Sequence, residues 1–413
     1  MKKTIRMLLC CVLSVTVLLA AVSCGTAGAT ELSGGYIRNS GDDVTPPAGF
    51  EEAAADFSLT LLENTLSKKG ENTLISPLSA LLCLALVANG ADGDTLEQME
   101  DAFGMSMDDL NPALYAFMSS LYSGDNCQFK FANSIWFNDA DFLTVHEDFL
   151  QTNANWYAAE IFKTPFTPKT ADAVNGWVKD KTDGMIDSIL KEVGDYDVLY
   201  LLNALVFDAK WVEMYEKSDV RDAEFTNYGG DVETVDMMYS YESLLRIKNA
   251  LGFTKAYWGG AYSFAALLPN EGVDIYDFAA NLDGEAWLAM WENRSGIACA
   301  GLPQFSYDTE ILLNDALMAM GMTDMFSGAA NFTRMAHSER GNISCSEVRQ
   351  KTFIEINSDG TRAAAATIAI MKDEGMDIVI DAETVILDRP FLYAIVDNAT
   401  GLPMFLGIVA NLK

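Results

Sequence analysis

Histidine is almost absent from the sequence, which has only His146 and His337 in 413 residues. Both lie in polar surroundings without the spacing of metal ligands, and we interpret both as surface residues. The chain contains no G-x-S-x-G, no H-E-x-x-H, no G-x-x-x-x-G-K-[ST] and no paired C-x-x-C. Because these motifs carry hydrolytic, metal-dependent, nucleotide-dependent and redox chemistry, their absence argues against those enzyme classes. We expect no catalytic residues, no metal ion and no cofactor.

Cysteine is scarce as well. Three of the seven cysteines lie within the first 24 residues, and the remaining four are Cys83, Cys127, Cys299 and Cys345. Four scattered cysteines are too few for a disulfide framework. They can pair in three ways, and the sequence does not choose between pairing and free thiols.

Positive charge is the third scarcity, with 27 Lys+Arg against 59 Asp+Glu and a net charge of −32. Residues 1–23 hold three bases and no acids, so the rest of the chain has 24 Lys+Arg and a charge near −35. Such a charge argues against nucleic acids, heparin-like polyanions and anionic lipid headgroups as partners. Two interpretations stay open: attraction of a basic macromolecule, or simply the acidic surface of an extracellular protein.

The N-terminus reads as an export signal. Residues 1–23 have a basic start and then an apolar run, followed by small residues. The stretch Ala21–Cys24 resembles a bacterial lipoprotein cleavage box, with alanine where leucine is usual, and makes Cys24 a candidate lipid attachment site. Ala27–Ala29 offers an ordinary signal-peptidase site instead. We favour lipid anchoring to the outer face of the cell membrane over free secretion. No later stretch is long and uninterrupted enough to predict a transmembrane helix.

The rest of the chain predicts one large α+β domain. Residues 24–49 are rich in Gly, Thr, Ser and Pro, which is typical of a flexible tether, and residues 50–413 contain no second linker or repeat. The first third of this domain is helical and the last third is rich in strands. Residues 391–409 predict a hairpin that is buried on both faces.

One stretch does not fit its surroundings. "SDGTRAAAATIAIMKDEG", residues 358–375, lies between strand-like segments, yet Ala363–Ala366 is a run of the best helix former and a poor strand former. A surface helix is a weak explanation, because the stretch has no amphipathic stripe and its alanines lead into β-branched residues.

This stretch resembles the reactive-loop hinge of the serpins, the serine protease inhibitor family. Further motifs of that family follow in the expected order over residues 50–413: "NTLISPLSA", "FANSIWF", "VNGWVKDKTDGMI", "LLNALVFDAKW", "LLPNEG", "GLPQFSYDTEILLNDALMAMGMTDMF" and "DRPFLYAIVDNATGLPMFLGIVANL". One such match is weak evidence, but the ordered set is very specific.

The resemblance implies the serpin fold: a large central mixed β-sheet, additional sheets, about nine helices and an exposed reactive loop. It also implies a suicide inhibitor of serine proteases, or of cysteine proteases. The target cleaves the loop, stays attached as an acyl-enzyme and is trapped when the loop inserts into the central sheet. We expect a monomer. The alternative is a non-inhibitory serpin that acts as a binding or chaperone-like protein.

Insertion as a strand explains the alanines, because alternate residues of a strand point to opposite faces. After Gly360, one set of side chains is Thr361, Ala363, Ala365, Thr367 and Ala369. The other set is Arg362, Ala364, Ala366, Ile368 and Ile370. The first set is uniformly small, as a face that slides over a close-packed core requires. We therefore predict that the first set faces the core.

The resemblance also implies residues that hold the sheet until it opens. They are Ser76, Ser79, Asn203, Trp211 and Gln350. At Gln350 the family commonly has a histidine tied to an asparagine, here Asn203, and we expect the amide to preserve that link. Ser358 and Arg362 replace residues that are often acidic in the family.

The cleaved bond decides the target. Counting fourteen residues beyond Gly360, as in typical inhibitory serpins, predicts cleavage at Glu374–Gly375 and a glutamate-preferring protease. The loop is slightly long for the family, so three alternatives remain. Met376 ranks next, for an elastase-like enzyme, followed by Lys372 for a trypsin-like one and Met371.

Overall fold

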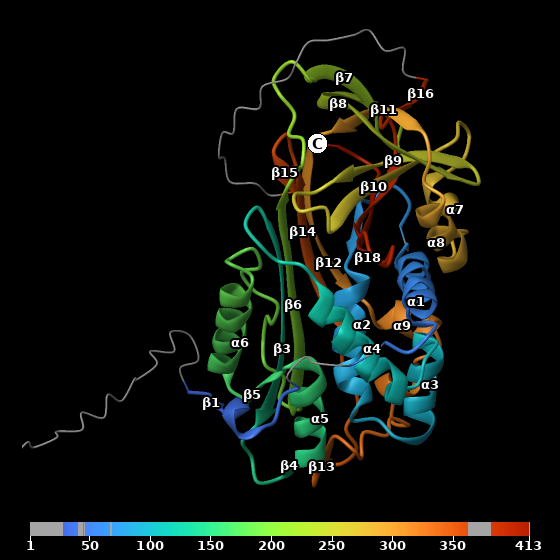
Figure 1. The fold of residues 1–413 in the computed structure, drawn as a ribbon. Helices are drawn as coiled ribbons and strands as arrows, with labels where there is room; N and C mark the ends of the chain where they lie inside the picture. The colour runs from blue at the N-terminus through green and yellow to red at the C-terminus, as the bar shows by residue number, and fades with distance from the viewer. Residues whose placement is uncertain (1–27, 40–43, 45, 67, 362–380, 413) are drawn as a thin grey trace, which may run out of the picture.

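The computed structural model describes residues 28–39, 44, 46–66, 68–361 and 381–412 (Figure 1). The signal segment with Cys24, the hinge residues Ala363–Thr367 and the four candidates for the cleaved bond (Glu374–Gly375, Met376, Lys372, Met371) lie outside the described residues.

Nine α-helices occur in the described part of the chain, in agreement with the expected number. They are α1 (Phe50–Thr65), α2 (Pro77–Ala88), α3 (Gly93–Phe103), α4 (Met107–Ser120), α5 (Glu147–Tyr157), α6 (Pro168–Lys181), α7 (Ile275–Ala279), α8 (Gly284–Glu292) and α9 (Asn314–Ala319). Among the described residues, none of these helices has the length and apolar character needed to cross a membrane.

Two large sheets carry most of the strands. The seven-stranded sheet has the order β1 (Thr30–Glu31), β5 (Glu160–Thr164), β3 (Cys127–Asn138), β6 (Leu199–Lys210), β15 (Gly360–Thr361), β14 (Arg349–Ile356) and β12 (Phe305–Leu312). The nine-stranded sheet runs β16 (Ala382–Ile386), β11 (Ile297–Pro303), β8 (Val232–Ile247), β9 (Ala250–Ala256), β10 (Tyr262–Pro269), β17 (Phe391–Asp397), β18 (Pro403–Val409) and β2 (Thr73–Ile75), with β7 (Val220–Thr226) on β8. Strands β4 (Leu143–Val145) and β13 (Ala336–Ser338) form a small third sheet.

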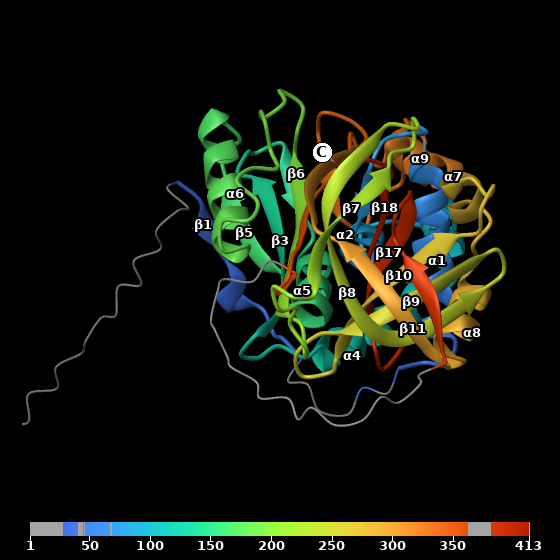
Figure 2. The ribbon, with the colours of Figure 1, turned by 90° about the horizontal axis from the view of Figure 1, so that it is seen from above.

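The seven-stranded sheet has a different cover on each face, as Figure 2 shows from above. Helix α2 packs against both β6 and β18, so the main core lies between the two large sheets. Helix α6 covers the opposite face with a smaller core of its own, built around Trp136, Val174 and Trp177. The predicted hairpin is confirmed, because every residue of β17 and β18 is buried.

Part of the predicted tether is built into the fold. Thr30–Glu31 pairs with β5 as the edge strand β1, and Leu32 N–H donates to Ile161 O at 2.8 Å. The hydroxyl of Ser33 accepts from Ile161 N–H at 2.9 Å. The edge of β5 offers unpaired main-chain groups, and these attract an extended segment whatever its composition. The composition of residues 24–49 predicted a flexible tether, but Thr30 and Glu31 within it are ordered by their pairing with β5.

Candidate functional site

The central feature is a slot in the seven-stranded sheet. Strand β15 lies between β6 and β14, but it contributes only Gly360 and Thr361, whereas β6 has twelve residues and β14 has eight. Beyond β15, no strand pairing joins β6 to β14 among the described residues. Two narrow cavities of about 50 and 30 Å³ follow the slot, and both strands line each of them. The sheet is therefore one strand short along most of this line.

Strand β15 fixes where an added strand begins. Gly360 pairs with Lys210, Thr361 pairs with Ala209, and Thr361 also faces Ile356. A Cβ on Gly360 would lie 2.1 Å from the carbonyl oxygen of Ala209, so only glycine allows this approach. Thr361 is 3% exposed, and its hydroxyl contacts that of Tyr257 in the core. The predicted inward direction of the first set is thus confirmed at Thr361, its one described member.

The turn before β15 is held by the chain that follows β6. The N–H of Trp211 donates to Asp359 O at 3.0 Å, and the Trp211 indole donates to Asn357 O at 2.9 Å. The Tyr215 N–H donates to Ser358 O, also at 3.0 Å. Trp211 therefore lies at the top of the slot, where the resemblance placed it.

Asn357 shapes the same turn and was not identified from the sequence. Its side-chain oxygen accepts from the N–H groups of Asp359 at 3.0 Å and Gly360 at 3.1 Å. The turn signature Asn-Ser-Asp-Gly indicates this arrangement. Tyr215 and Tyr257 were also missed, and no local sequence signal identifies them because their partners are distant in the chain.

Lower in the slot, the expected hydrogen bond between Gln350 and Asn203 is not formed, and both side chains have other partners. Its side-chain oxygen accepts from Ser76 N–H at 2.9 Å and its NH₂ donates to Ser76 O at 2.8 Å. Asn203 instead donates to Asn133 Oδ1 at 2.8 Å. The expected link is wrong: the oxygen and the NH₂ of the Gln350 amide lie side by side and bind the N–H and C=O of one residue, Ser76.

Ser76 and Ser79 lie at the start of α2, beside the slot. The Ser76 hydroxyl accepts from Ser79 N–H at 3.3 Å and donates to Met404 O at 2.9 Å. Ser76 thus connects α2, β18 and, through Gln350, β14. Asn203, the last of the residues expected to hold the sheet closed, lies on β6. Its buried Oδ1 has no hydrogen-bond donor in the described part of the chain.

We predict that Gln350→Leu destabilises the intact protein. The variant leaves the buried N–H of Ser76 without a partner and removes one of the two donors to its C=O, which still accepts from Ala80 N–H. The unsatisfied N–H costs about 1–3 kcal/mol. Denaturant unfolding should show a lower midpoint with an unchanged slope. Lys351→Leu, the next residue and half-buried, serves as the control. Equal stability of Gln350→Leu and the control would contradict this role of the amide.

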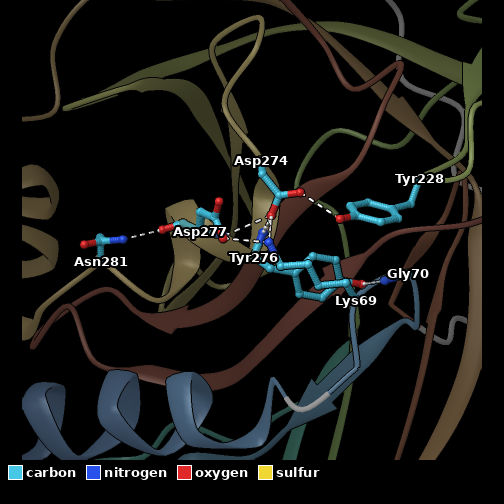
Figure 3. A network of polar contacts seen from close by, with 7 residues as sticks. All are labelled: Lys69, Gly70, Tyr228, Asp274, Tyr276, Asp277 and Asn281. Carbon is cyan, nitrogen blue, oxygen red and sulfur yellow. Dashed lines mark hydrogen bonds and ion pairs between the residues drawn. The ribbon is translucent and has the colours of Figure 1, made fainter.

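A second polar cluster lies outside the slot, at the start of α7 (Figure 3). Lys69 Nζ binds Asp277 at 2.7 Å and Asp274 at 3.1 Å, while the Tyr228 hydroxyl donates to Asp274 at 2.8 Å. The hydrogen bonds to Asp277 and Asp274 raise the pKa of Lys69. The cluster joins the loop before β2 to α7. Because Asp274 and Asp277 already accept from Lys69 and Tyr228, it offers no free acid–base pair.

Metal-binding groups and reactive thiols were the remaining candidates for chemistry in the described part of the chain. No group of His, Cys, Asp and Glu in the described part of the chain could hold a metal ion. Cys83, Cys127, Cys299 and Cys345 are free thiols. Burial raises the pKa of the Cys83 and Cys345 thiols to about 12, so both are protonated at neutral pH and poorly nucleophilic.

A sheet that is one strand short along a central slot is the architecture of a protein built to accept a further strand. The family model described as "Serpin (serine protease inhibitor)" matches residues 52–412. The chain belongs to the serpin family.

Individual relatives agree with this assignment. Serpin-ZXA of Oryza sativa subsp. japonica is 31% identical, with 83% of this chain and 90% of its own covered. Neuroserpin of Rattus norvegicus is 29% identical, with 89% and 93% covered. Among solved structures, the native state of the thermophilic serpin tengpin matches with a TM-score of 0.87 at 41% identity, covering 93% of this chain and 100% of tengpin. The latent state of tengpin gives a TM-score of 0.79.

Proposed function

We propose that the protein is a suicide-substrate inhibitor of serine endopeptidases, or of cysteine endopeptidases, and not an enzyme. The catalytic residue of the target attacks the carbonyl carbon of the scissile bond, the new amine leaves, and the acyl-enzyme is trapped when the freed loop enters the slot. The observation that carries this proposal is the slot itself, which β15 has begun to fill.

The register of β15 predicts where each later residue would lie after insertion. Continued downwards, the pairing places Ala363 between Phe207 and Ile354, and Ala365 between Leu205 and Thr352. These four neighbours are buried and point towards the main core. A small side chain is needed at each place, because a close-packed core has no room for a large one.

Thr367 would arrive at the lower end of the slot, between Asn203 and Gln350. The buried Oδ1 of Asn203 has no donor in the described part of the chain, and a threonine hydroxyl supplies one. The small side chains at 363, 365 and 367 thus match the inward-facing residues of β6 and β14 beside which they would lie. This match favours an inhibitory serpin over a non-inhibitory one.

Arg362 would lie on the outward face, between Asp208 of β6 and Glu355 of β14. We predict that Arg362→Glu lowers the stability of the loop-cleaved form, because like charges directly across neighbouring strands cost up to about 1 kcal/mol per pair. The melting temperature of cleaved Arg362→Glu should be lower than those of the cleaved wild type and of cleaved Arg362→Gln. No difference between the cleaved glutamate and glutamine variants would contradict this placement.

The target follows from the cleaved bond, for which we propose Glu374–Gly375 first and Met376–Asp377 second. These correspond to a glutamate-specific and an elastase-like protease. The acidic surface favours basic proteases, with an association rate that falls as salt rises. We also propose that Cys24 anchors the protein to the outer face of the cell membrane, with free secretion as the alternative.

Incubation with a panel of serine and cysteine proteases tests the function. We expect a complex that survives a denaturing gel, and a released peptide whose mass gives the cleaved bond. Cleavage without any complex would refute inhibition and support a binding role, such as the one that thyroxine-binding globulin, a serpin of the same fold, has for thyroxine. A peptide beginning at neither Gly375 nor Asp377 would refute both proposed bonds.

A further inference from the structure

Beneath the turn that precedes β15 lies a buried ion pair. Lys255 on β9 binds Glu242 on β8 at 2.8 Å, and their side chains are 3% and 13% exposed. A buried ammonium group is retained only with a partner, and here the partner comes from the neighbouring strand. Neither residue belongs to the motifs that indicate the family.

The pair also contacts the two residues that hold the turn. The Lys255 ammonium group lies 4.3 Å from the ring centre of Tyr215 and 5.7 Å from that of Trp211. Both distances are within the range of cation–π attraction. Glu242 accepts from the Ser240 hydroxyl at 2.7 Å, and Ser240 contacts the Tyr215 hydroxyl at 3.2 Å. Tyr215 is thus held at its ring by Lys255 and at its hydroxyl through Glu242.

Tyr215 and Trp211 transmit this restraint to residues 357–359. Three donors reach the turn from outside it, two main-chain N–H groups and one indole, and all belong to Trp211 and Tyr215. With the turn fixed, Gly360 and Thr361 pair with β6 before any cleavage. The conformational entropy lost at the first step of insertion is then smaller.

We propose that Lys255 and Glu242 are positioning residues for loop insertion, acting through Tyr215 and Trp211 on the turn at 357–360. The inference rests on the proposed inhibitory function. The pair keeps the first residues of the new strand in place, so that insertion outpaces hydrolysis of the acyl-enzyme.

The test compares Lys255→Met with a control, Lys163→Met, which removes an exposed lysine of β5 that pairs with Asp139, two strands away from the slot. In Lys255→Met, we expect the ratio of hydrolysed to trapped acyl-enzyme to rise roughly 5- to 30-fold, the factor expected for loss of a desolvated cation–π contact. This ratio is the number of moles of inhibitor consumed per protease trapped, minus one. The rate of attack on the loop should stay the same. Tyr215→Leu should behave like Lys255→Met, whereas Tyr215→Phe, which keeps the ring over Lys255 but loses the hydroxyl contact to Ser240, should show a smaller rise.

Hydrogen–deuterium exchange of the intact variants gives a readout that needs no protease. Amides of residues 357–361 should exchange faster in Lys255→Met than in Lys163→Met. Unchanged exchange there, or a lower melting temperature with unchanged stoichiometry, would overturn the proposal. If the wild type traps no protease, the inhibitory function fails. The exchange result then still decides whether the pair restrains the turn.

Discussion

A single cut within residues 368–379 is expected to raise the melting temperature by roughly 10 °C or more, which for a domain of this size corresponds to about 8 kcal/mol of added stability. Once cut, the loop can fill the slot between β6 and β14. On the sides that face each other across this slot, these two strands pair with no described residue beyond β15. The new strand adds main-chain hydrogen bonds on both sides and buries the small set of side chains.

Calorimetry of the intact and cut protein measures this shift, after mass spectrometry has verified the single cut. The Ala365→Glu variant, cut in the same way, is the matched control and should gain much less. Unchanged melting of the cut wild type would show that the loop does not insert.

Ala365→Glu is expected to convert the inhibitor into a substrate. The register places this residue between Leu205 and Thr352, on the face of the main core. An unpaired carboxylate in that core costs several kcal/mol. An increase of about 3 kcal/mol in the insertion barrier slows insertion roughly 100-fold, so hydrolysis of the acyl-enzyme should win.

Ala364→Glu is the control for the opposite face. It would lie between Val206 and Phe353, whose side chain is 38% exposed, so the added carboxylate can reach water. Ala366 is less suitable, because its neighbour Ala204 is buried beneath α6. Inhibition should survive in Ala364→Glu, and an equal loss in both variants would show that the faces are assigned wrongly.

The sequence by itself determined the class of fold. Ordered motifs predicted a serpin, and the alternation of small residues after Gly360 predicted which face enters the core. The buried position of Thr361 agrees with this alternation, which depends on local geometry: the period of a strand and the space that one side chain occupies. For Ala363, Ala365, Thr367 and Ala369 the alternation stays a prediction.

Only the tertiary structure decided which distant groups meet. It paired Thr30–Glu31 with β5, directed Gln350 to the main chain of Ser76 and placed Lys255 beneath Tyr215. Each of these contacts joins residues that are far apart in the chain. An amide or an ammonium group binds whichever partner folding brings within reach, and composition or spacing along the chain does not contain that information.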